Sequence, residues 1–599
     1  MRLVSSMRGL ALALLAGLFC VSPILAATPE SPAPQLGTQI EDFTLRDYRG
    51  KERSLKEFDG KPVAVVFVGS DCPLAKLYAP RLEEIFQQYK EQGVGVVAIN
   101  SNVQDSLEKV GAYARVHKVT FPVLKDPDNK VADLFDAKRT PHAYVLDADR
   151  VVRYVGRIDD QYGLGATSGY AKPELENSYV ADAIRNLLDG GEVKHASTQP
   201  TGCIIGRKAD VAPHGEVTYS NQVSRILNTR CVSCHRDGEV APFPLTNYDE
   251  VNGWGEMILE VIEKGQMPPW FANPEYGEYK NDCRLSQQEK DTLQAWVDNG
   301  SPEGDPSDLP EPPQFVEGWQ IGEPDQIVEM PVDYEVPAEG VVEYKYFVVD
   351  PGWTEDKWIK AAEARPGNRA VVHHIIATPG AGFAPGMPPT MHPEGVATFI
   401  PAGTKIRFQM HYTPNGSPQT DRSKVGFIFC DESEVKKIRT GGLVGKWNFA
   451  IPPHDSNYKI VGEQEVRRDM LLTSMLPHMH LRGKSFRYEA DFPDGTTKIL
   501  LDVPNYDFNW QLNYELVEPL LMPKGTTFRI IAHYDNSEDN LANPDPSETV
   551  RYGDQTWEEM VHGFYSSLPI ETIQEKKARR DQEKKKREQA KAEKADEAG

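Results

Sequence analysis

Cysteine is scarce in this chain, with seven residues among 599. Cysteines this few and this widely spaced exclude the disulfide-dense scaffolds of small secreted domains. Positive charge is also short: 66 lysine and arginine residues stand against 89 aspartate and glutamate residues, for a formal charge of −23. That balance argues against nucleic acid or an anionic membrane surface as a partner. Beyond the N-terminus no apolar run reaches transmembrane length, so no spanning segment is expected.

The N-terminus has the pattern of a secretory signal peptide. Arg2 and Arg8 form a basic region, residues 9–20 are almost wholly apolar, and the small residues Ala26 and Ala27 follow. This pattern predicts a signal peptide over residues 1–26 and a periplasmic or secreted protein.

Residues 36–190 alternate two kinds of pattern. KPVAVVFVG and VGVVAIN are apolar runs typical of buried strands, whereas APRLEEIFQQYKEQ and DSLEKVGAYARVH have helical spacing. The alternation predicts an α/β domain with a mixed sheet covered by helices. Residues 191–215 hold few periodic residues, which indicates a linker.

After residue 215 the sequence pattern becomes helical, and after residue 325 it becomes β-rich. Residues 216–304 carry short helical patterns around the motif CVSCH and predict an all-α domain, and the Pro- and acid-rich residues 305–325 predict a second linker. From 326 to 567, β-rich runs such as TKIRFQMHY and TTFRIIAHY alternate with turns, which favours two all-β sandwiches, over 326–450 and 451–567. Residues 568–599 form a tail that is rich in charged residues from 571 onward, which indicates a solvated helix or a disordered segment.

The motif CVSCH is the spacing that attaches a c-type haem. Cys231 and Cys234 would bind the haem covalently, and His235 would supply one axial ligand. Met267, in KGQMPPW, could be the second axial ligand, since Met/His ligation suits electron transfer. The alternatives are a redox or zinc pair at CxxC and a packing role for Met267. The segment resembles a small cytochrome c domain of the type found beside redoxin modules in large bacterial secreted proteins.

Five further histidines fall in three groups. His478 and His480 are two apart in a β-rich region, and such residues share a face of a strand. His373 and His374 are adjacent, so on a regular strand they face opposite ways and share a metal only at a bulge or strand end. His411 is the fifth. Imidazoles suit copper among the first-row metals; the alternative is structural or surface histidine clusters.

The motifs VVHHIIATPG, RFQMHY, LPHMH and WEEM occur in the order found in the copper type II, ascorbate-dependent monooxygenases, which this region resembles over about residues 326–567. The resemblance implies two jelly-roll domains, each with one copper, and an open cleft between them. It places an electron-storing copper on His373, His374 and His411. It places a second copper, which binds oxygen and abstracts hydrogen from a substrate C–H bond, on His478, His480 and Met560.

Three positions of this region differ from the peptide-hydroxylating members of that family. Leu476 stands where the peptide-hydroxylating members have an arginine that grips a carboxylate, and His562 and Phe564 replace their asparagine and tyrosine substrate contacts. The resemblance therefore implies the chemistry without the peptide substrate. His533 is interpreted as a structural histidine, with an extra ligand as the alternative.

The N-terminal module resembles the redoxin branch of the thioredoxin fold. FVGSDCPLAKLYAP places Cys72 at a strand-to-helix junction, where a helix N-terminus lowers a thiol pKa. Pro141 occupies the position of the fold's cis-proline. Ala75 stands where the resolving cysteine of CxxC would be, and Gly69 where peroxiredoxins have threonine. Cys203 is a candidate resolving partner; whether Cys72 is reactive or an inert relic stays open, as does any pairing of Cys283 and Cys430.

Three hypotheses follow. The leading one is an exported copper monooxygenase with two copper ions and one covalently attached c-type haem. It would use O2, an unidentified small-molecule or peptide substrate, and an external electron donor that feeds the haem. The second is a non-catalytic copper and haem electron-transfer or copper-binding protein. The third is a thiol peroxidase acting through Cys72.

Overall fold

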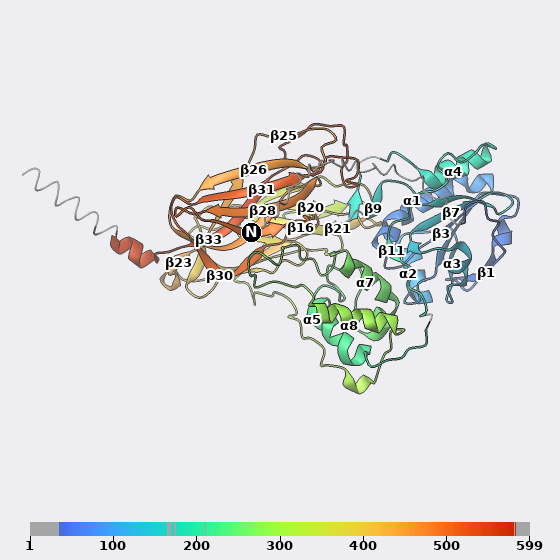
Figure 1. The fold of residues 1–599 in the computed structure, drawn as a ribbon, viewed down its shortest axis with the longest axis horizontal. Coiled ribbons are helices and arrows are strands. Elements are labelled where there is room, and N and C mark those ends of the chain that lie inside the picture. The colour runs from blue at the N-terminus through green and yellow to red at the C-terminus, as the bar shows by residue number, and fades with distance from the viewer. Residues whose placement is uncertain (1–34, 165–168, 173–174, 210, 580–581, 583–599) are drawn as a thin grey trace, which may run out of the picture.

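A computed structural model describes residues 35–579 and 582 of the chain, except 165–168, 173–174 and 210. The predicted signal peptide and most of the charged tail lie outside the described residues. Figure 1 shows an α/β part (blue), a helical part (green) and a long β-rich part (yellow to red). Across the described ranges, no helix has both the length and the apolar character needed to cross a membrane.

The N-terminal part is built on a seven-stranded mixed sheet of order β2-β1-β5-β4-β3-β7-β8. Strand β3 (Val63–Phe67), next to the central strand β4 (Gly95–Asn100), is wholly buried. It pairs parallel with β4 and antiparallel with β7 (His142–Leu146). Alternate residues of β3 pack into two different cores, one on each face of the sheet. The predicted thioredoxin-like α/β domain is confirmed.

The other elements of this domain complete the sheet and cover it. They are β1 (Thr44–Asp47), β2 (Glu52–Ser54), β5 (Val123–Lys125), β8 (Val152–Gly156), α1 (Pro73–Tyr89), α2 (Leu107–Val116), α3 (Lys130–Phe135) and α4 (Tyr179–Leu188). Helices α1, α2 and α4 bury residues in the core on one face, and α3 buries residues in the core on the other.

The predicted linker 191–215 is not without regular structure. It contains β11 (Cys203–Ile204), which pairs antiparallel with β6 (Arg139–Thr140) of the redoxin domain. Gly202 makes this approach possible: its φ is +131°, and a Cβ there would lie 2.0 Å from the Thr140 carbonyl oxygen. The chain therefore returns to the redoxin domain before it enters the helical part.

Residues 216–304 form the predicted helices around CVSCH, namely α5 (Ser224–Arg230), α6 (Tyr248–Val251), α7 (Gly255–Glu263) and α8 (Gln287–Asp298). Ser286 and Glu289 form a reciprocal capping box at the start of α8. The buried side chains of Trp254, Leu293 and Trp296 belong to the same apolar cluster as one face of the redoxin sheet. The two parts are thus packed on each other.

The β-rich part consists of two sandwiches with separate cores. When the eight main strands of each are numbered in chain order, both show the same arrangement: 1-8-3-6 in one sheet and 2-7-4-5 in the other. The first unit comprises β12 (Gln326–Glu329), β14 (Lys345–Val349), β15 (Lys357–Arg365), β16 (Val372–Thr378), β17 (Ala381–Phe383), β19 (Val396–Ile400), β20 (Ile406–Tyr412) and β22 (Lys424–Phe429). The second comprises β24 (Thr440–Gly445), β26 (Tyr458–Glu465), β27 (Met470–His478), β28 (Gly483–Asp491), β29 (Thr497–Val503), β30 (Tyr514–Met522), β31 (Thr527–Tyr534) and β33 (His562–Pro569).

The helical part is also anchored to the second sandwich. Trp270 and Tyr279 are buried in that sandwich's core, where their rings lie 4.9 and 5.5 Å from the ring of Tyr514. Tyr279 forms an isolated bridge with Leu516, and its hydroxyl donates to the Leu500 carbonyl at 2.9 Å. Residues 270–281 therefore fix the helical part to the β-rich part through apolar burial.

Candidate functional sites

Two thiols lie side by side at the edge of the redoxin domain. Cys72 immediately precedes α1, as predicted, and Pro73 is the first residue of that helix. The Cys72 Sγ lies 2.9 Å from the Thr140 carbonyl oxygen, next to the Thr140–Pro141 cis peptide. Cys203 is paired directly opposite Thr140 in the β6–β11 ladder, and its thiol is hydrogen-bonded to the Cys72 sulfur.

The environment makes the two thiols unequal. Burial alone would raise the pKa of Cys72, but hydrogen bonds from the Cys203 thiol and from the Ala75 N–H lower it to about 6. The same hydrogen bond, together with burial, raises the pKa of Cys203. Cys72 is therefore the thiolate of the pair and Cys203 the protonated partner, which is the division of roles that a nucleophile and a resolving thiol require.

The structure explains why glycine and alanine replace the usual redoxin residues at positions 69 and 75. A Cβ at Gly69 would lie 2.6 Å from Asn102 Nδ2 and 3.2 Å from the Cys72 Cβ, so a threonine does not fit there. Ala75 is buried and offers only its N–H to the thiolate. The second thiol comes from residue 203, beyond the domain's last helix.

The first histidine cluster is assembled across β16 and β20. The β16–β20 register shifts between Val372 and His374, and this irregularity turns His373 to the same side as its neighbour. His411 Nδ1 lies 3.1 Å from His373 Nδ1 and 3.2 Å from His374 Nε2. One ligand atom from each residue lies within 4.8 Å of the other two, and no other set of three His, Cys, Asp or Glu residues in the described chain does so.

Burial lowers the pKa of all three imidazoles, to about 4 for His373 and well below the usual range for His374 and His411. They are therefore neutral at pH 7, the state in which imidazole binds a metal. His411 sits on β20 between the buried Met410 and Tyr412, so the alternation of the strand directs it to the outer face of the sheet. Three neutral, converging imidazoles fit a copper ion.

His478 and His480 lie close together, but not on one strand as predicted. β27 ends at His478, and His480 lies just beyond it; the two ring centroids are 5.2 Å apart. His478 Nδ1 is held by Gln511 Oε1 at 2.8 Å, and His480 Nδ1 by the Glu558 carbonyl at 3.1 Å. His480 Nε2 is buried without a hydrogen-bond partner. An orphaned ring nitrogen of this kind fits a metal ligand whose other nitrogen is fixed.

Glu559 ties the methionine segment to these histidines. Its buried carboxylate accepts hydrogen bonds from the backbone N–H groups of His480 at 2.9 Å, Arg482 at 2.7 Å and Met560 at 3.3 Å. Met560 is thereby held beside His480. Neither this clamp nor Gln511 was identified from the sequence, because only the fold brings residues 511 and 559 to residues 478–480.

One aromatic ring borders both clusters. The ring of Phe508 lies 5.8 Å from the ring of His411 and 6.0 Å from that of His480. The centroid of the Phe508 ring also lies 6.3 Å from the ring centroids of His373 and His374, so Phe508 borders every histidine of the first cluster.

The other predicted residues are placed as follows. His562 pairs with His478 across β27 and β33, with ring centroids 6.1 Å apart, and its Nε2 is also buried without a partner. His533 lies on β31 and bonds Ser485, away from both clusters. Leu476 and Phe564 pair with each other on the same ladder.

The CVSCH segment forms a turn directly after α5. His235 Nδ1 is 3.1 Å from the Phe243 carbonyl oxygen, which leaves Nε2 as the nitrogen able to bind iron. The Phe243 ring stacks on Trp254, with centroids 3.9 Å apart, and gives the histidine an aromatic wall. Met267 follows α7, and its N–H donates to the Val261 carbonyl. A CxxCH turn with an oriented histidine fits covalent haem.

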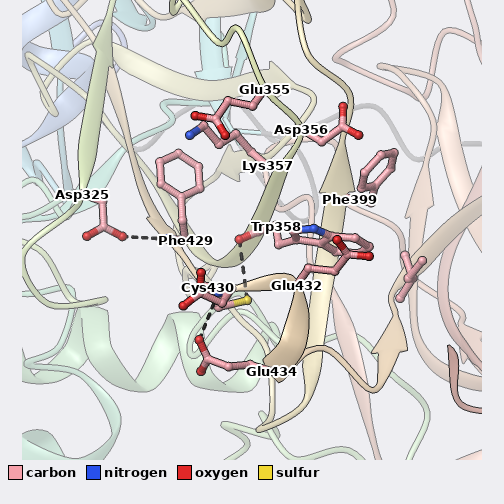
Figure 2. A pocket seen from close by; sticks show the side chains of 12 residues that line it. Asp325, Glu355, Asp356, Lys357, Trp358, Phe399, Phe429, Cys430, Glu432 and Glu434 are labelled. Atoms are coloured by element: carbon pink, nitrogen blue, oxygen red, sulfur yellow. Dashed lines mark hydrogen bonds between the residues drawn. The ribbon is translucent and has the colours of Figure 1, made fainter. Parts of the chain in front are cut away.

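A pocket on the first sandwich lies apart from these groups (Figure 2). It has a volume of about 960 Å³ and combines aromatic rings with acidic side chains, among them Trp358, Phe399, Asp356 and Glu434. Cys430 lines it, whereas Cys283 lies near Cys231 and Cys234. All six described cysteines are free thiols, and Cys283 and Cys430 do not pair.

Comparison with known proteins concerns the N-terminal domain. Residues 36–155 match the family described as the AhpC/TSA family. The thiol-disulfide oxidoreductase ResA of Geobacillus kaustophilus (strain HTA426) is 29% identical over 126 residues, which are 21% of this chain and 71% of that protein. The chloroplastic peroxiredoxin Q of Sedum lineare is 35% identical over 127 residues, 20% of this chain and 67% of that protein. A hypothetical protein of Sinorhizobium meliloti 1021 has a solved structure that is 32% identical over 30% of this chain and 97% of its own, with a TM-score of 0.27.

The lowered pKa of Cys72 predicts its pH profile. Alkylation by iodoacetamide should rise as the thiol ionises, with a midpoint near pH 6, because the folded pKa is about 6. Cys203→Ala removes a hydrogen bond to the thiolate and should move the midpoint upward by about one unit or more. Peptide mass spectrometry measures both rates. Cys430, whose pKa burial raises, serves as the internal control; a Cys72 midpoint near 8.5, that of an ordinary thiol, would contradict the assignment.

Proposed function

Because the chain belongs to the AhpC/TSA family through residues 36–155, we propose that its redoxin domain is a thiol-dependent oxidoreductase, in which Cys72 is the nucleophile and Cys203 the resolving thiol. The observation that carries this proposal is geometric: Cys203 is paired with Thr140, whose carbonyl oxygen lies 2.9 Å from Cys72 Sγ. The contact between the two thiols lowers the pKa of Cys72 and raises that of Cys203. The names of the relatives indicate two substrate classes, disulfides and peroxides.

The chemistry is the same for either class up to the leaving group. The Cys72 thiolate attacks one atom of the S–S or O–O bond, and the other atom leaves with the bonding electrons and takes a proton. The Cys203 thiol then loses its proton and attacks the Cys72 sulfur, which expels the remaining group and forms a disulfide. Two electrons pass from the thiol pair to the substrate, and an external thiol returns them.

One equivalent of hydrogen peroxide should convert Cys72 and Cys203 into one disulfide, detected by peptide mapping without reduction. Cys203→Ser should leave Cys72 as a sulfenic acid, seen as one added oxygen on the Cys72 peptide by mass spectrometry, and Cys72→Ser should abolish both products. Cys430→Ser is the matched control and should change neither. The proposal fails if Cys72 stays reduced while Cys430 is oxidised.

We also propose that the β-rich part binds two copper ions. The convergence of His373, His374 and His411 supports the first site, and the orphaned Nε2 of His480 supports the second. The strand order 1-8-3-6 and 2-7-4-5 in both sandwiches is that of a jelly roll, which agrees with the resemblance to copper monooxygenases. Bound copper would supply electron storage at one cluster and oxygen activation for C–H hydroxylation at the other.

The protein's own contribution at these sites is orientation. The bulge at His373, the Gln511 hydrogen bond to His478 and the Glu558 carbonyl at His480 fix which ring nitrogens face inward. Glu559 holds Met560 beside His480, and a thioether favours copper(I). An unidentified small molecule fits the departures at Leu476 and His562 better than a peptide with a terminal carboxylate. Copper or haem electron transfer without hydroxylation is the competing reading, which coupled oxygen uptake would exclude.

Copper titration of the metal-free protein should give two bound ions per chain. His411→Ala removes one of three ligands at the first site and should weaken that site about tenfold or more, whereas the second stays filled. His392→Ala is a matched control, because His392 bonds Thr398 and lies outside both clusters. Met560→Ala should weaken the second site only. Unchanged copper content in both His411→Ala and Met560→Ala would overturn this second proposal.

For the helical part we propose covalent haem on Cys231 and Cys234, with His235 as one axial ligand, Met267 as the other, and an electron-transfer role. The fixed Nδ1 of His235 supports the first ligand. The N-terminal sequence supports export to the compartment in which such haem is attached.

The pyridine haemochrome spectrum of protein made with haem-attachment machinery should show one c-type haem, and Cys231→Ala with Cys234→Ala should remove it. Met267→Ala should remove the thioether-to-iron charge-transfer band at the red end of the spectrum. If that band persists, Met267 is not the ligand; if no haem is attached to the wild-type protein, the haem proposal fails.

A further inference from the structure

Helix α7 packs against β11, the strand that carries Cys203, beside the thiol pair. The exposed fraction is 0% for Cys72 and 7% for Cys203. The N–H of Ile204, next to Cys203, donates to the Met257 sulfur of α7 at 3.4 Å. Met257 packs against the same apolar cluster that contains both cysteines. Both sulfurs are thus shielded from solvent, and α7 packs on the segment that carries Cys203.

An ion pair fastens α7 to β6, the strand that pairs with the one carrying Cys203. Arg139 Nη2 lies 3.0 and 2.9 Å from the two carboxylate oxygens of Glu260 on α7. The other guanidinium nitrogen, Nη1, donates to the Gly202 carbonyl at 2.8 Å. Arg139 thus holds β11 and α7 at once, and both side chains are largely shielded from water. A charge-assisted contact of two oxygens in a shielded position is stronger than an ordinary surface pair.

The surfaces on this side of the redoxin domain are packed without spare room. The side chain of Gln104 lies between Gly206, just after β11, and Gly253, just before α7. A Cβ at either glycine would lie 2.1 Å from Gln104 Oε1. The absence of two side chains here is what lets the helical part approach the thiol pair so closely.

We propose that α7 is a lid that restricts the thiol pair to small oxidants, and that the Arg139–Glu260 ion pair holds the lid closed. This inference rests on the proposed redox function of Cys72 and Cys203. It makes Glu260 a specificity-determining residue: it touches no substrate, and it decides which size of substrate reaches the sulfur.

The step that the closed lid permits is balanced as follows. The Cys72 thiolate attacks a hydroperoxide oxygen, the O–O bond breaks, and water or an alcohol leaves after protonation. Cys203 then attacks the sulfenic sulfur, its proton leaves with the hydroxyl as water, and the disulfide forms. A small-molecule dithiol restores the pair. A protein disulfide would have to place both of its sulfurs in line with Cys72 Sγ, in space that α7 occupies.

The experiment compares two reagents on the full-length reduced protein. Hydrogen peroxide probes access for a small oxidant, and the aromatic disulfide DTNB probes access for a bulky one, each followed as the rate of Cys72 modification by peptide mass spectrometry. Glu260→Ala should raise the DTNB rate about tenfold or more and leave the peroxide rate within about twofold, since local opening limits only the bulky reagent. Glu260→Gln, which removes the charge but keeps the shape, should act in the same direction.

Glu256→Ala is the matched control, because Glu256 is an exposed residue one turn earlier on α7. It should match the wild type with both reagents. Equal DTNB rates in the wild type and both Glu260 variants, with a normal peroxide rate, would overturn the lid and leave the redox function standing. Failure of both reagents to modify Cys72 in every variant would instead overturn the proposed function, and a parallel rise with both reagents in Glu260→Ala would show general loosening and overturn size selection.

Discussion

The backbone pairing of Cys203 with Thr140 is the contact on which the N-terminal half depends. It is possible only because residue 202 is a glycine with positive φ. A Cβ at this position would lie 2.0 Å from the Thr140 carbonyl oxygen, which is too close for any other residue. The pairing brings the Cys203 thiol to Cys72 from beyond the last helix of the redoxin domain. It also directs the chain into the helical part, so that α7 arrives beside the thiols and Arg139 meets Glu260.

A different constraint shapes the β-rich part. Strand alternation fills each sandwich core with apolar side chains and leaves histidines on outer faces, where His411 sits between the buried Met410 and Tyr412. A histidine on the outer face of one sheet would be solvated if the sandwich stood alone. Here the segment 506–511 of the second sandwich covers the first cluster: Phe508 packs on His411 while Gln511 orients His478. One short segment therefore joins both clusters.

Local patterns predicted much of this. Apolar runs predicted the α/β sheet, the Ser286 cap marked α8, and the glycine- and proline-broken runs marked the sandwiches. The adjacency of His373 and His374 required an irregular strand, and the register shift is there. The contacts between residues far apart in the sequence were not predicted. The predicted linker contains β11, because a two-residue strand has no periodicity to detect. Phe508 and Gln511 belong to no motif, and Glu559 is in WEEM only as the neighbour of Met560; all three act on histidines far from them in the sequence. The position of Phe508 between the two clusters was not predicted, since sequence spacing does not report how two sandwiches approach.

The helical part contacts the redoxin domain and both sandwiches, and these contacts limit how α7 can move. It touches the redoxin domain through Glu260, the first sandwich through the Glu239–Arg369 ion pair, and the second sandwich through the buried Trp270 and Tyr279. The redoxin domain is also held elsewhere: Trp254 and Trp296 share its apolar core, and His117 Nδ1 lies 2.9 Å from the Gly416 carbonyl oxygen of the first sandwich. A movement of α7 that exposes the thiols must therefore be local. It breaks the Arg139–Glu260 pair and the contact of Met257 with Ile204, and it leaves the packing between the domains in place. The thiol pair and the histidine clusters can then be changed independently, although one chain carries both.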